Sequence, residues 1–124
     1  MKWLALLAGG GIGASLRYGL SVWVDQRLVS SFPWGTLLVN LIGSFLIGVL
    51  VSVFEQRGLT SPALRLFWIT GVLGAFTTFS TFSLETMHLL EAGRLYLAAA
   101  NVTASVVVCV LAAFGGIALA RSLG

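Results

Sequence analysis

Charged residues are scarce in this sequence. Asp, Glu, Lys and Arg together make up 9% of its 124 residues, whereas hydrophobic residues make up 58%. A soluble domain usually carries about 25% charged residues, so this chain has too few to cover a surface in water. The scarcity excludes an ordinary soluble protein and indicates that a lipid bilayer is the solvent.

Cysteine, histidine and clustered positive charge are also nearly absent. The single cysteine, Cys109, excludes an intramolecular disulfide, and the single histidine, His88, has no neighbouring ligands that would suggest a zinc site. The seven Lys and Arg residues are scattered singly, without a patch that would suit a nucleic acid backbone. No nucleophile, base and orienting group fall together, so we expect that the chain is not an enzyme.

Four long apolar segments are present instead. A transmembrane helix needs roughly 20 apolar residues, and residues 3–24, 34–54, 64–90 and 96–119 have this length. The first segment begins like a signal peptide, but Arg17 and a glycine cluster interrupt it, which favours a retained helix. The sequence therefore predicts an all-α protein in which residues 1–124 form a single transmembrane domain of four spans.

The third apolar segment is longer than a membrane requires. A continuous helix of about 27 residues would reach roughly 40 Å, against a hydrocarbon core of about 30 Å. Gly71, Gly74, Thr77 and Thr78 favour a break near residues 74–77, with Thr77 or Thr78 capping a second half-helix. The alternative is an intact, tilted helix. A break inside a membrane must be buried in protein or line a cavity.

Positive charge is divided almost evenly between the two sides of the predicted bundle. The side of the termini carries four Lys or Arg residues, and the other side carries two, or three if Arg17 reaches it. Orientation follows this bias, so a weak bias predicts insertion in both directions. Four spans without an internal repeat are few to enclose a pathway, and we expect an antiparallel homodimer to complete one.

Small and polar residues recur at four-residue intervals on two of the spans. The second span has Thr36, Asn40, Ser44, Gly48 and Ser52, and the fourth has Asn101, Ser105, Cys109 and Ala113. A packing seam of small residues explains most of them, including Asn101 and Cys109 on the fourth span. Asn40 differs, because an amide at mid-span favours a polar partner or an aqueous pathway. We interpret the fourth-span row as a seam in which Ser105 is a candidate pore contact.

Phe76, Phe79 and Phe82 fall three residues apart on the third span, beside rows of serine and threonine. An aromatic stripe at this spacing is usually core. In a membrane, next to hydroxyl donors, its positive ring edges could also hold an anion. Without a fixed cation the binding would stay weak enough for conduction. Arg17 has two open interpretations: it draws anions into a vestibule, or it reaches the interface or pairs with Glu85.

Three blocks of this sequence fall on three of the four predicted spans, in order. The blocks are Gly10-Gly11-x-Gly13-Ala14-x-x-Arg17-Tyr18, Gly35-Thr36-Leu37-x-Val39-Asn40-x-x-Gly43-Ser44-Phe45-x-x-Gly48 and Gly71-x-x-Gly74-x-x-Thr77-Thr78-Phe79-Ser80-Thr81-Phe82. They closely resemble the Fluc (CrcB) family of fluoride channels. One departure is Ala75, where the family often has glycine, and the fourth span carries no comparably sharp motif.

The resemblance implies a fold, a function and a set of site residues. It implies four-span proteins that pair as antiparallel homodimers in the bacterial plasma membrane, with two pores that release toxic fluoride passively. It also implies a structural sodium ion (Na+) held by main-chain carbonyls of Gly74 and Thr77. The fluoride pathway that it implies is lined by Asn40, Phe79, Phe82, Ser80 and Thr81.

Two other functions remain open at this stage. A small proton-coupled multidrug exporter also has four spans and dual topology, but it would need a carboxylate in the membrane, and Glu85 would have to serve. A non-transporting membrane subunit that assembles through its glycine seams would need no pathway at all. Glu85 also leaves open whether fluoride passes alone or in exchange with protons.

Overall fold

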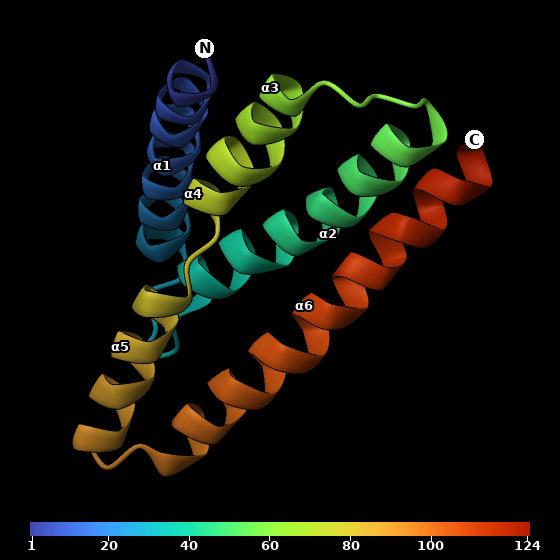
Figure 1. Cartoon of the computed structure of the whole chain (residues 1–124). Coiled ribbons are helices and arrows are strands. Elements are labelled where there is room, and N and C mark those ends of the chain that lie inside the picture. Colours follow the sequence, from blue (N-terminus) through green and yellow to red (C-terminus); the bar gives the residue numbers. More distant parts are fainter.

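The chain folds entirely into helices. The computed structural model describes residues 1–124 (Figure 1). Three helices are continuous: α1 (Lys2–Arg27), α2 (Trp34–Gln56) and α6 (Leu95–Leu123). Between α2 and α6 the chain forms a composite of four pieces: α3 (Pro62–Arg65), the π-helix η1 (Leu66–Leu73), α4 (Gly74–Phe76) and α5 (Phe79–Glu91). The predicted all-α class is confirmed.

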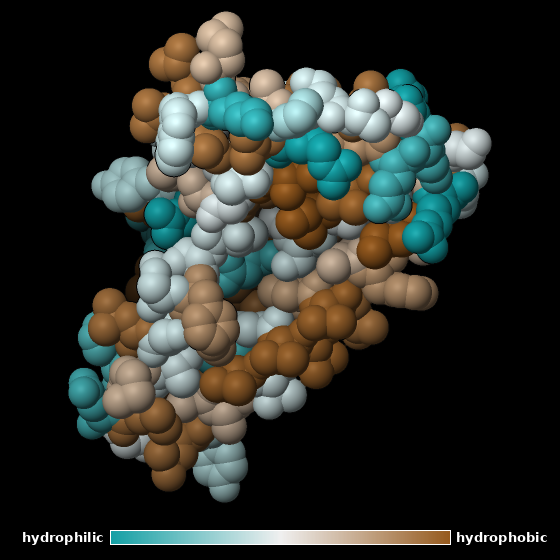
Figure 2. All heavy atoms as spheres, in the orientation of Figure 1, coloured by the Kyte–Doolittle hydropathy of each residue, from teal (hydrophilic) through white to brown (hydrophobic).

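Three helical segments are long and apolar enough to cross a membrane: Trp34–Gln56, Pro62–Glu91 and Leu95–Leu123. Helix α1 has the length, but its glycines and charged residues lower its mean hydropathy, and its place as a fourth span stays a prediction. Figure 2 shows hydrophobic side chains over much of the visible face. Hydrophilic ones gather at the end near the C-terminus.

The third span is broken, as the sequence predicts. Thr77 and Thr78 adopt extended backbone conformations between α4 and α5. The side-chain oxygen of Thr78 accepts a hydrogen bond from Thr81 N (3.1 Å) and so caps α5. The intact tilted helix is therefore wrong. The π-helix before the break was not predicted, because the apolar run Leu66–Leu73 carries no signal that separates i→i+5 from i→i+4 bonding.

Glycines bring two pairs of helices into backbone contact. In α1, a Cβ atom on Gly9 or Gly13 would run into the carbonyl oxygens of Phe67 and Val72 in η1. In the second pair, a Cβ on Gly48 of α2 would meet the Ala113 carbonyl oxygen of α6. The predicted packing seam is thus confirmed at Gly48.

The break also corrects the expected aromatic stripe. Phe76 ends α4 and is buried near Gly43, whereas Phe79 and Phe82 belong to α5. Their ring centroids lie 5.3 Å apart. Two extended residues separate Phe76 from the others, so a helical spacing of three does not place all three rings on one face.

Candidate functional site

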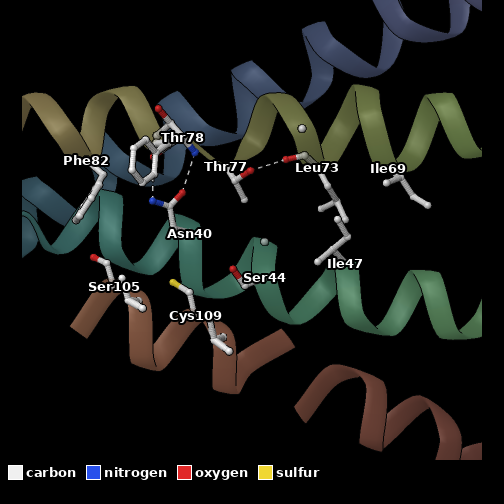
Figure 3. Close-up of a pocket in the computed structure, with 15 residues that line it drawn as sticks. Asn40, Ser44, Ile47, Ile69, Leu73, Thr77, Thr78, Phe82, Ser105 and Cys109 are labelled. Carbon is white, nitrogen blue, oxygen red and sulfur yellow. Dashed lines mark hydrogen bonds between the residues drawn. The ribbon is translucent and has the colours of Figure 1, made fainter. Parts of the chain in front are cut away.

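A groove of about 450 Å³ opens beside the break. Helices α2, α5 and α6 and the end of the first half of the third span contribute to its wall (Figure 3). Six of the eight predicted site residues line it, and the other two, Ser80 and Thr81, follow directly at the start of α5. The six are Asn40, Gly74, Thr77, Phe79, Phe82 and Ser105.

Asn40 binds the backbone of the break at two points. Its Nδ2 donates to the Thr78 carbonyl oxygen (3.0 Å), and its Oδ1 accepts from Thr78 N (2.8 Å) (Figure 3). A buried backbone N–H or C=O without a partner is unfavourable by about 1–3 kcal/mol, and Asn40 pairs with both of these groups of Thr78. The amide has a second N–H that this pairing does not use.

The Thr78 side chain organises the hydroxyl groups at the start of α5. Its hydroxyl donates to Thr81 Oγ1 (3.1 Å) and lies 3.3 Å from Ser80 Oγ. Thr81 therefore accepts one bond and keeps its own O–H free to donate elsewhere. The capping residue is buried, whereas Ser80 is exposed.

Two carbonyl groups beside the groove lose their usual helical donors. In a continuous helix, Thr78 N would donate to Gly74 O and Thr81 N would donate to Thr77 O. Here Thr78 N donates to Asn40 instead, and Thr81 N donates to the Thr78 hydroxyl. The two side chains thus divert both donors, and the i→i+4 bonds to Gly74 and Thr77 are not made.

The two phenylalanines of the groove, Phe79 and Phe82, differ in how much of the side chain is exposed. Phe79 is 78% exposed, whereas Phe82 is 9% exposed and forms part of the core. Both rings line the groove, together with Ser105 and Cys109 of α6 on the opposite wall. Phe79 therefore offers its ring to whatever fills or covers the groove.

A second polar pair lies toward the other end of α5. The Thr36 hydroxyl donates to Glu85 Oε1 (2.5 Å), and this bond joins α2 to α5. Glu85 also lines a separate cavity of about 460 Å³, together with Asp25, His88 and Arg94. The hydrogen-bond partner that the structure gives Glu85 is thus Thr36, and the role of Arg17 stays a prediction. Residue spacing along one helix could not reveal the Thr36–Glu85 bond.

A hydrogen-bonded chain between α5 and α6 was also missed. Asn101 Nδ2 donates to Thr86 Oγ1 (3.0 Å), and Asn101 Oδ1 accepts from Ser105 Oγ (3.4 Å). The four-residue spacing of Asn101 and Ser105 signals a shared face, but nothing in the sequence pairs Asn101 with Thr86. The packing-seam interpretation correctly predicted that Asn101 is buried, but it did not predict the hydrogen-bond partners of Asn101.

A helical membrane protein with a mostly apolar groove, which carries a few polar groups at a broken span, is the class that these features define. The chain matches the family described as CrcB-like protein, Camphor Resistance (CrcB), over residues 4–117. It therefore belongs to the CrcB family.

Relatives of known name resemble the chain over nearly its full length. A protein of Agrobacterium fabrum is 51% identical over 121 residues, or 97% of each chain. One of Magnetococcus marinus is 52% identical over 121 residues, covering 98% of this chain and 97% of the relative. One of Rhizobium meliloti is 49% identical over 116 residues, covering 94% and 93%. All three are named fluoride-specific ion channel FluC. The resemblance seen in the sequence is confirmed, as is the prediction that the chain is not an enzyme.

Proposed function

We propose that this chain is a fluoride channel that lets the ion leave the cell passively. The observation that carries the proposal is the groove, in which an amide, a hydroxyl and two phenyl rings from three helices meet at a helix break. The names of the relatives support the same ion. Membership of the CrcB family weighs against a multidrug exporter and against a non-transporting subunit.

The chemistry of the groove suits a small, strongly hydrated anion. Moving a small ion into a medium of low dielectric is very unfavourable, of order 20 kcal/mol by Born estimates, so protein donors must replace its water stepwise. The second N–H of Asn40, the hydroxyls of Ser80 and Thr81, and the ring edges of Phe79 and Phe82 supply such donors. The Ser105 hydroxyl would join them only by giving up its bond to Asn101 Oδ1. None carries a fixed charge, so the ion can leave.

The working channel is an antiparallel homodimer with two pores, in which α1 serves as the fourth span. Its location is the plasma membrane of a bacterium. The open groove supports a second copy as the missing wall, because Phe79 and the α6 residues Val106 and Val110 are exposed beside it. Cysteine tags at Lys2 and Arg94, with Cys109 removed, should each react from both sides of the membrane. Labelling from one side only would end the antiparallel arrangement.

The carbonyls of Gly74 and Thr77 fit a sodium ion. Sodium prefers hard oxygen ligands, and both carbonyls lose their i→i+4 donors at the break. Two carbonyls from each of two copies would give four oxygens. The bound ion would link the copies and add positive charge near the anion path. Replacing sodium by potassium should lower the thermal stability of the purified dimer, and equal stability in both salts would argue against the site.

Fluoride efflux from liposomes that contain only the purified protein tests the function. A channel releases fluoride with or without a proton gradient, whereas an exchanger requires the gradient. An exporter would move organic cations instead, and a non-transporting subunit would move nothing. Absence of fluoride efflux from vesicles with verified, folded protein would overturn the proposal.

A further inference from the structure

Asn101 is among the most deeply buried side chains of the molecule. It is 1% exposed, although it is an amide in the second turn of an apolar helix. A buried amide is unfavourable unless its polar atoms are paired. Asn101 has both atoms paired, with Thr86 of α5 and Ser105 of α6. It does not line the groove, so direct contact with an ion in the groove is not its role.

The partners of Asn101 connect it to both walls of the groove. Thr86 donates its own hydroxyl proton to the Phe82 carbonyl oxygen (2.8 Å), and Phe82 lines one wall. Ser105 donates to Asn101 Oδ1 and lines the opposite wall. One continuous chain of hydrogen bonds thus runs from the backbone of Phe82 on α5 to the hydroxyl of Ser105 on α6.

Besides this chain, the Thr36–Glu85 hydrogen bond to α2 is the other side-chain hydrogen bond that fixes the body of α5 laterally. The extended break separates it from η1 and α1, and α5 packs chiefly on α6 (Figure 1). The Thr86–Asn101 bond is the side-chain hydrogen bond between these two helices. Networks of buried hydrogen bonds rigidify a structure when every member is satisfied.

We propose that Asn101 is a positioning residue that fixes α5 against α6 and thereby sets the distance between Phe82 and Ser105 across the groove. For ion conduction the inference rests on the proposed fluoride channel, whereas the helix spacing can be measured without any flux. Asn101 acts through Thr86 and Ser105 and needs no contact with the ion.

Substitutions that remove one polar group at a time test this role. Thr86→Val removes the hydroxyl with little change of shape, and Asn101→Val removes the amide. Thr103→Val is the matched control, because Thr103 is exposed on the same helix as Asn101. Fluoride efflux should fall about ten-fold or more in the first two variants and stay at the wild-type rate in the control, since misplacement by about 1 Å can slow a site up to 10²-fold. The double variant should lose no more than the worse single variant, because the two residues share one interaction.

A distance measurement separates this inference from the channel assignment. Spin labels at Leu84 of α5 and Val102 of α6, in a Cys109→Ala protein diluted with unlabelled copies, report the spacing of the helices. The distance distribution should broaden with Thr86→Val and with Asn101→Val, but not with Thr103→Val. An unchanged distribution, additive losses in the double variant, or efflux within about two-fold of wild type would each overturn the positioning role. If the wild-type protein carries no fluoride, the channel assignment fails and the distances alone decide.

Discussion

The α2–α6 seam and the break in the third span differ in how their backbone peptide groups find hydrogen-bond partners. At the seam, glycines remove side chains, so that two complete helices touch through their backbones, Gly48 against Ala113 and Gly116 against Phe45. At the break, the helix itself is opened, and the Asn40 and Thr78 side chains supply the partners that the helix would have provided.

The difference shows where this chain can carry a polar site. A closed helix satisfies its own peptide groups, so the glycine contacts of the seam leave no backbone group for a ligand and only hold the helices together. An opened helix leaves some backbone carbonyls free. It is stable only where polar side chains pair with the other N–H and C=O groups that the break releases. The groove lies at the break for this reason, and the four predictions below separate the two strategies.

The largest effect is expected at the seam. Gly48→Leu should destabilise the protein by about 3 kcal/mol or more, because the new side chain must push α6 away along a backbone contact. Gly115→Leu is the control, since a Cβ at Gly115 meets nothing within 4 Å. Unfolding in a denaturing detergent measures both. Equal stability of the two variants would mean that the seam is not a close contact.

Loss of the Asn40 side chain should come next. Asn40→Leu leaves the N–H and C=O of Thr78 without partners, which should lower stability by about 1–3 kcal/mol for each group that stays dry. Ser44→Ala, one turn along the same helix, should change stability much less. The same unfolding assay compares them. Identical unfolding curves for Asn40→Leu and wild type would show that water, or a closed helix, replaces the amide at no cost.

Removal of the aromatic rings should affect flux more than folding. Phe79→Leu and Phe82→Leu keep apolar bulk but lose the positive ring edge, so fluoride efflux should fall about ten-fold, equivalent to about 1.4 kcal/mol on the barrier. Phe79→Leu should leave stability unchanged, because the ring is 78% exposed in the protomer. Phe76→Leu, before the break, should still conduct. Normal efflux with both Phe79→Leu and Phe82→Leu would return the rings to an ordinary packing role.

The smallest effect is expected at the cap of α5. Thr78→Val keeps the branched shape but removes the oxygen that accepts from Thr81 N, and loss of an N-cap lowers stability by about 1 kcal/mol. Thr78→Ser retains the oxygen and should behave like wild type. Thermal unfolding distinguishes them. If both variants unfold alike, the hydroxyl does not cap the helix.

Local signals in the sequence predicted much of this arrangement. The apolar runs gave three of the spans that the structure bears out, and the glycines and threonines of the third run predicted the break. Features that depend on two helices meeting could not be predicted. Thr36 with Glu85, and Thr86 with Asn101, are pairs across helices that no spacing along one helix encodes. Phe76 was misplaced because the helical period does not continue through extended residues.

The π-helix Leu66–Leu73 has a consequence for the length of the chain. Each of its turns closes i→i+5 bonds and so holds more residues than an α-helical turn. Deletion of one residue there could be absorbed by a return to i→i+4 bonding, with Gly74 and the break left in place. The same deletion in α2, upstream of Asn40, would rotate every later side chain by about 100°, since an α-helix has 3.6 residues per turn. The third span thus contains a stretch in which chain length can vary while the groove keeps its form.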